Sequence, residues 1–113
     1  MEFLALIYTA DGSTDVEMPE LMQQYQAFGA EAGAAGVIVG GNALEAVTTA
    51  TSLQVRNGKT HITDGPFAET KEQLGGYYLL ECKDLDEAVK WASKIPSARF
   101  GTIEVRPVMV FDQ

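Results

Sequence analysis

The 113-residue sequence is poor in residues that bind metals or form disulfides, with one cysteine and one histidine. A single cysteine cannot form an internal disulfide, so the sequence favours a reducing, cytoplasmic environment. Cys82 lies in an apolar strand pattern, where a buried, unreactive thiol is more common than a nucleophile. A histidine-rich metal site is excluded, and acidic residues without a metal-loop spacing are weak evidence for one. We therefore expect no metal and no cofactor.

Positive charge and long apolar runs are also scarce. The chain has 8 basic and 16 acidic residues, and its formal net charge is −8. Because phosphate binding requires a clustered cationic face, we do not expect nucleic acid as a partner. An anionic membrane surface is disfavoured for the same reason. No stretch approaches the ~18 apolar residues of a membrane-spanning helix, and the N-terminus lacks a signal-peptide pattern.

The composition is otherwise that of one globular domain spanning residues 1–113, with 46% hydrophobic and 21% charged residues. Residues 3–8 form a continuous apolar run, which is typical of a central strand buried on both faces. Pro19 suits the first turn of a helix, and Gly36 its end. The apolar face of that helix is Leu21, Tyr25, Phe28, Ala32 and Ala35.

The second half of the chain repeats the strand and helix pattern. Residues 37–39 begin a strand that Gly40 and Gly41 soon interrupt, and residues 76–82 form the next strand. Asp84 caps a helix, with Glu87 in a capping-box arrangement. The last predicted strand, residues 102–111, contains Pro107, which indicates a sheet edge or a bulge.

Between these elements, residues 48–64 predict a β-hairpin that turns at Asn57-Gly58. A two-residue turn pairs Arg56 with Lys59 and Leu53 with Ile62. One face of the hairpin is then apolar, and the single histidine, His61, lies on the polar face as a surface residue. By the same alternation Asp64 shares the face of Ile62, and we expect its side chain to point inward.

Apart from the hairpin, the order is βαββαβ. This order predicts an α+β, ferredoxin-like fold, in which both helices cover one face of an antiparallel sheet. The other sheet face would be apolar and uncovered, and such a face is rarely left in water. We therefore expect a second copy of the chain, in a homodimer, to cover it.

The segment after the hairpin reads Asp64-Gly65-Pro66-Phe67-Ala68-Glu69-Thr70-Lys71-Glu72. It resembles the signature of the DGPF (DGPFAETKE) group of YCII-related proteins. That resemblance implies a dimeric α+β barrel, in which two sheets pack face to face and leave a cleft in each subunit. It also implies an association with alternative sigma factors. Some YCII-related proteins have a proposed His–Asp pair, with the histidine near the start of the first helix. Residues 20–24 contain no histidine here.

Two interpretations of Asp64 stay open. As an inward carboxylate it would serve as a general acid–base or bind a ligand. Alternatively, it caps the turn before Gly-Pro through its side chain. The long loop that follows is either a functional lid or a solvated surface, and Phe67 is more readily explained as a hydrophobic pin. The candidate ligand-binding residues are Tyr8, Gly65, Pro66, Phe67, Glu69, Lys71 and Arg106.

Two classes of function follow from these residues and from the resemblance. In one, the protein binds an unidentified small molecule in a cleft at the dimer sheet face, with acid–base catalysis by Asp64. In the other, it is a non-catalytic regulatory or protein-interaction module associated with alternative sigma factors.

Overall fold

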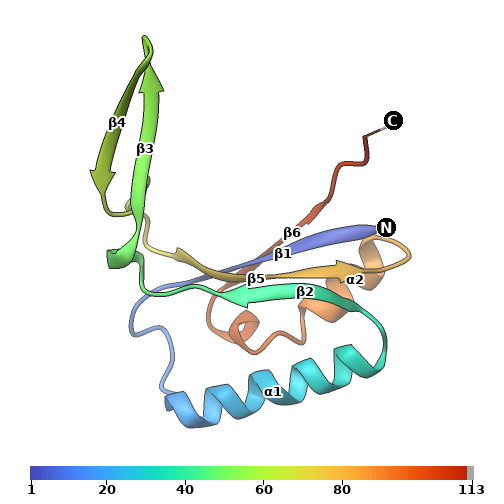
Figure 1. The fold of residues 1–113 in the computed structure, drawn as a ribbon. Coiled ribbons are helices and arrows are strands. Elements are labelled where there is room, and N and C mark those ends of the chain that lie inside the picture. The colour runs from blue at the N-terminus through green and yellow to red at the C-terminus, as the bar shows by residue number, and fades with distance from the viewer. Residues whose placement is uncertain (112–113) are drawn as a thin grey trace.

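The computed structural model describes residues 1–111, and its central feature is a four-stranded antiparallel sheet (Figure 1). The strands are β1 (Glu2–Thr9), β2 (Ile38–Ala43), β5 (Gln73–Glu81) and β6 (Thr102–Pro107). Their order across the sheet is β2-β5-β1-β6. With the helices α1 (Met18–Ala34) and α2 (Leu85–Ala92), this is the predicted α+β, ferredoxin-like arrangement.

Both helices pack on one face of the sheet, and the other face is open. On β1 the side chains of Phe3, Ala5 and Ile7 are buried beneath the helices, whereas Leu4 and Leu6 on the opposite face are only half-buried. The strand is central, as predicted. The expectation that it is buried on both faces is wrong for the single chain, because helices cover only one side.

Side-chain hydrogen bonds and a proline define the ends of α2 and η2 and join η2 to α1. The N–H of Glu87 donates a hydrogen bond of 2.9 Å to the Asp84 carboxylate, so the predicted cap of α2 is confirmed. Pro96 begins a short 3₁₀ helix, η2 (Pro96–Arg99), after α2 has ended. The hydroxyls of Tyr25 in α1 and Ser97 in η2 share a hydrogen bond, which joins the two helical segments.

Strand β2 continues through its two glycines, contrary to the predicted interruption. Gly40 pairs with Leu79 and Gly41 with Tyr78, after a register shift that follows Ile38. A Cβ on Gly41 would lie 2.6 Å from the Tyr77 carbonyl oxygen and 2.8 Å from Cδ1 of Tyr78. Glycine is therefore needed at Gly41 for close approach to β5, and it does not end the strand.

The predicted hairpin forms, and its register is confirmed. It consists of β3 (Thr51–Arg56) and β4 (Lys59–Asp64), preceded by the 3₁₀ turn η1 (Val47–Thr49). Asn57 and Gly58 have φ angles of 54° and 75°, as a two-residue hairpin turn requires. Figure 1 shows the hairpin standing away from the sheet on the side opposite α1. We call residues 51–64 the arm.

The chain beyond β6 also leaves the sheet. Pro107 is the last residue of β6, an edge strand that pairs with β1, so the predicted strand to residue 111 is too long. Residues 108–111 are exposed and rise on the same side as the arm, at the opposite end of the sheet (Figure 1). No helix within residues 1–111 is long and apolar enough to cross a membrane.

Candidate functional site

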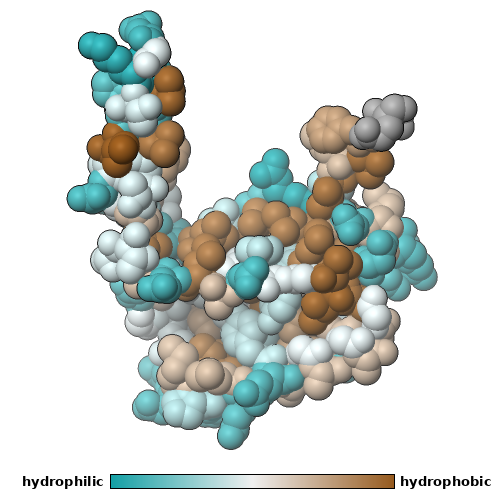
Figure 2. All heavy atoms as spheres, viewed as in Figure 1, coloured by the Kyte–Doolittle hydropathy of each residue, from teal (hydrophilic) through white to brown (hydrophobic). Residues whose placement is uncertain are grey.

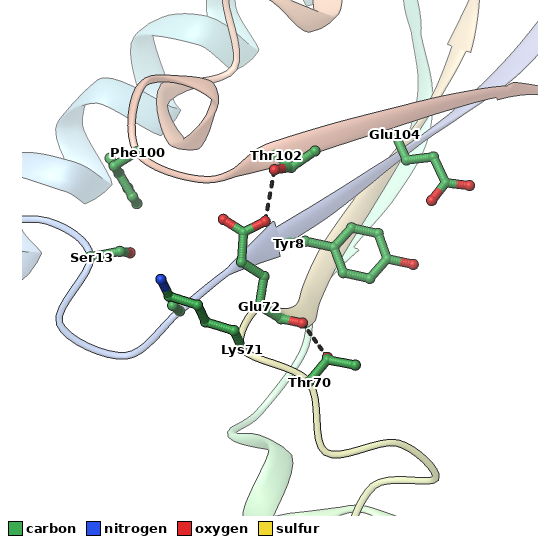
Figure 3. Close-up of a pocket in the computed structure, with 9 residues that line it drawn as sticks. Tyr8, Ser13, Thr70, Lys71, Glu72, Phe100, Thr102 and Glu104 are labelled. Carbon is green, nitrogen blue, oxygen red and sulfur yellow. Dashed lines mark hydrogen bonds between the residues drawn. The ribbon is translucent and has the colours of Figure 1, made fainter.

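An open pocket of about 850 Å³ lies where the end of β1, the start of β6 and the loop before β5 meet (Figure 3). Strand alternation directs Tyr8, Thr102 and Glu104 to the open face of the sheet, because Tyr8 pairs with Thr102 and Leu6 with Glu104. The loop adds charged side chains to the same space. The pocket is lined by Tyr8, Ala10, Ser13, Thr70, Lys71, Glu72, Phe100, Thr102 and Glu104.

The best-positioned ionic group in the pocket is the half-buried carboxylate of Glu72. The Thr102 hydroxyl donates a hydrogen bond of 2.7 Å to Glu72 Oε1, which links the loop to β6. The Thr70 hydroxyl bonds the Glu72 backbone carbonyl oxygen and closes the turn before the strand (Figure 3). Together these contacts hold one carboxylate at a defined place in the pocket.

The other ionisable groups of the pocket lie on either side of this carboxylate, Lys71 on one side and Tyr8 and Glu104 on the other (Figure 3). Lys71 supplies an ammonium group, Glu104 a second carboxylate and Tyr8 an aromatic ring with a hydroxyl (Figure 3). Such a set matches a small polar molecule that carries both a cationic or hydroxyl group and an anionic group. Tyr8 and Lys71 were both predicted as ligand-binding residues, and the structure brings them to one pocket.

Asp64 is placed differently from the prediction. It is exposed at the foot of the arm, and every residue of β4 is exposed, so the expectation that its side chain points inward is wrong for the single chain. The register holds to Asp64, which pairs with Thr51. The prediction assumed that the hairpin packs on the sheet of its own chain, whereas the hairpin stands away from it. Within residues 1–111 we find no hydrogen bond of the Asp64 carboxylate, so the turn-cap interpretation is not seen either.

The turn beside Asp64 is held by other groups. The N–H of Gly65 bonds the carbonyl oxygen of Ala50 at 2.7 Å, and the Ser52 hydroxyl bonds the Gly65 carbonyl oxygen at 2.8 Å. Gly65 has a φ of 109°, which side-chain-bearing residues rarely adopt. Gly65 therefore shapes the exit from the arm.

The other predicted ligand-binding residues are scattered. Pro66 lines a second pocket, of about 660 Å³, between η1 and the start of β5. Phe67 is 83% exposed, so its interpretation as a buried pin is wrong. Glu69 is exposed outside both pockets. Arg106 does not line the first pocket. Its Nε lies 3.8 Å from Oε2 of Glu104, which does, and the two side chains form an exposed ion pair.

The sequence analysis missed Thr102 and Glu104, and Glu72 entered it only as the last residue of the signature segment. Glu104 could have been predicted, because it is two residues from Arg106 and strand alternation puts both side chains on one face of β6. Thr102 had no signal of its own. Its role depends on the approach of a loop 30 residues earlier in the chain.

The cysteine lies outside the pocket. Cys82 is buried, and burial raises the pKa of its thiol, with further increases from the nearby carboxylates of Glu87 and Glu81. A raised pKa keeps the thiol protonated and unreactive. Among residues 1–111, no three His, Cys, Asp or Glu side chains are grouped to hold a metal ion.

Comparison with known proteins gives the family. The model of the YCII-related domain matches residues 1–112. A curated relative, the uncharacterized protein R00369 of Rhizobium meliloti (strain 1021), is 47% identical over 66 residues, which are 57% of this chain and 53% of that protein. The match thus spans about half the length of that relative. Because the family model covers nearly the whole chain, the protein belongs to the YCII-related domain family.

Proposed function

We propose that the protein binds a small zwitterionic metabolite in the pocket formed by Tyr8, Lys71 and Glu72, at the open sheet face of a homodimer. The observation that carries the proposal is the position of Glu72, which Thr102 holds in the pocket that Lys71 also lines. The positioned carboxylate of Glu72 and the ammonium group of Lys71 would bind opposite charges of a ligand. Tyr8 offers an aromatic surface for its apolar part.

Ligand binding is tested by a thermal-shift screen of the purified protein against a metabolite library. A ligand at 100 times its dissociation constant adds about 2.7 kcal/mol of stability, enough for a shift of several degrees. We expect Glu72→Gln and Lys71→Met to abolish the shift. Glu69→Gln is the matched control, because it removes the same charge from the same loop outside the pocket. Equal shifts in all three variants would reject this site.

Acid–base catalysis by Asp64 is a second part of the proposal. Its support is position, since Asp64 is the last residue of β4 and leads into the loop that supplies Lys71 and Glu72. Once a ligand is identified, Asp64→Asn should eliminate its turnover while the melting temperature and ligand binding persist. Unchanged turnover in Asp64→Asn would reject Asp64 as the catalytic acid–base.

A second candidate function is a non-catalytic module that binds an alternative sigma factor. The exposed apolar side chains of the arm favour it, because Leu53, Val55 and Ile62 are 54–66% exposed. Gel filtration with a purified alternative sigma factor from the same organism tests it. Binding that persists in Glu72→Gln but disappears in Val55→Asp would support the module and not the metabolite site.

A further inference from the structure

The chain exposes far more surface than a compact monomer of its mass. It has 8092 Å² of solvent-accessible surface, whereas the size scaling of folded monomers gives about 6,100 Å² for 12.2 kDa. Its radius of gyration is 16.1 Å, against about 13 Å for a compact domain of this length. The surplus of roughly 2,000 Å² is more than twice the ~800 Å² that each partner buries in a standard interface.

The arm is the most exposed pair of strands in the chain. All residues of β4 and all of β3 except Ser52 are exposed, and a two-stranded hairpin alone is at best marginally stable in water. One face carries Leu53, Val55 and Ile62, each more than half exposed. The arm therefore presents an apolar face that no other segment of residues 1–111 covers.

The open face of the sheet is a matching surface. Leu4 and Leu6 of β1 pair with Leu79 and Tyr77 of β5, so these four half-buried side chains form a continuous apolar floor. Figure 2 shows apolar residues on the arm, on the C-terminal segment, and over the sheet between these two. Strands of six residues extend about 20 Å, enough to cross a four-stranded sheet.

Charge also pairs the arm with the body of a second copy. The arm contains two cations at its tip, Arg56 and Lys59, and one carboxylate, Asp64, which gives it +1. Since the whole chain carries −8, the remaining residues carry −9. The open face has Glu2 and Glu81 at one end and Glu104 near the other, and within the chain Glu81 pairs with the terminal amino group and Glu104 with Arg106. A cationic tip is thus attracted to the acidic body of another copy. The attraction therefore comes from the net charge of the body and not from bare carboxylates on this face.

We propose that the arm is exchanged between two copies, so that the apolar face of each arm packs on the open sheet face of its partner. The inference rests on the proposed homodimer and adds the element that forms it. A two-fold arrangement covers both arms and both sheets at once, and it closes without leaving an unpaired surface. Asp64 shares the face of Ile62, so the exchange would also turn its carboxylate toward the partner's sheet.

Analytical ultracentrifugation of matched variants tests the exchange. Val55→Asp places a charge on the apolar face of β3, and Gln54→Asp places the same charge on the opposite face one residue away. We expect a wild-type dimer, a dissociation constant raised at least ~10-fold in Val55→Asp, and a change below ~3-fold in Gln54→Asp. A monomeric wild type, or equal effects of the two variants, would overturn the proposal.

Cross-linking distinguishes exchange from an arm that folds onto its own sheet. A chain with Ile62→Cys is co-expressed with a longer, tagged chain with Leu6→Cys and treated with a short bismaleimide. We expect a linked product with the summed mass of both chains, and much less of it when His61→Cys replaces Ile62→Cys. The proposal is wrong if a link forms only when both cysteines are in one chain.

The experiments can reject the arm exchange and the metabolite-binding proposal independently of each other. If Val55→Asp is monomeric but no metabolite shifts the melting temperature, the arm exchange stands and the binding proposal does not. If a metabolite binds through Glu72 while Val55→Asp still dimerises like the wild type, the binding proposal stands and the arm exchange is rejected.

Discussion

At the scale of single residues, the carboxylates at the two ends of the signature segment, Asp64 and Glu72, have different surroundings. Glu72 is half-buried and accepts a hydrogen bond from Thr102, whereas Asp64 is exposed at the foot of the arm. A carboxylate oriented by a neighbour is better suited to recognise a ligand than one that moves with an exposed strand end. The single chain therefore favours Glu72 as the binding carboxylate, and a role for Asp64 depends on a partner.

Cys82 should resist alkylation in the folded protein. Its side chain is 2% exposed and its thiol pKa is raised, so both access and thiolate are limited. We expect iodoacetamide at pH 8 to modify Cys82 slowly in buffer and rapidly in urea, as followed by mass spectrometry. Cysteine in His61→Cys, which is exposed on the face of the arm opposite Ile62, should react at once. Equally fast reaction at both positions would contradict the burial of Cys82.

The same raised pKa predicts a pH dependence of stability. Above about pH 8.5 the unfolded chain loses the thiol proton, while folded Cys82 retains it. The unfolded state then binds fewer protons, so the free energy of unfolding falls as pH rises through this window. Urea titrations at pH 7.5 and 9.5 measure the fall, and Cys82→Ala should show a smaller one. An equal fall in both proteins would assign it to other groups.

At the scale of elements, the N-terminal cap of α2 contributes measurably to the free energy of unfolding. Asp84 accepts a hydrogen bond from the N–H of Glu87, and the N–H of Lys83 donates to the Glu87 carboxylate at 3.0 Å. Asp84→Ala should lower the free energy of unfolding by about 1 kcal/mol. Asp86→Ala is the control in the same first turn, with an expected loss of only a few tenths of a kcal/mol. Urea denaturation measures the free energy of unfolding of both variants. Similar losses in the two would show that the Asp84 cap does not stabilise the helix.

The two glycines of β2 should respond in opposite ways to the same substitution. A methyl group on Gly41 meets the backbone of Tyr77 and the ring of Tyr78, whereas one on Gly40 meets nothing within 4 Å. Gly41→Ala should destabilise the protein by about 1–3 kcal/mol. Gly40→Ala should be neutral or slightly stabilising, because alanine has less conformational freedom to lose. Melting temperatures of both variants provide the measurement. A tolerated Gly41→Ala would mean that β2 can move away from β5.

At the scale of the whole molecule, stability should depend on protein concentration. If two copies bury the arms and sheet faces together, dissociation is coupled to unfolding and mass action raises the melting temperature. We expect an increase of several degrees between about 1 and 100 μM for the wild type. The curve should be flatter for Val55→Asp. A wild-type melting temperature independent of concentration would argue for a monomer.

Much of the fold could be predicted because the signals are local. Alternation and turn residues gave the hairpin register, since Asn57-Gly58 permits a two-residue turn and each pairing then follows by counting. Asp84 and Glu87 gave the start of α2 for a similar reason. The Gly40-Gly41 interruption was wrong, because a close approach of β5 requires Gly41 within the strand and the sequence does not show that neighbour.

The sequence by itself determined the element order, the family and the identity of the charged segment that enters the pocket. These depend on neighbours along the chain. Tertiary structure alone decided that Thr102 orients Glu72, that Phe67 and Asp64 are exposed, and that the arm stands off the sheet. Alternation gives the two faces of a strand but not what covers them, because burial depends on contacts between segments far apart in the chain or in a second copy.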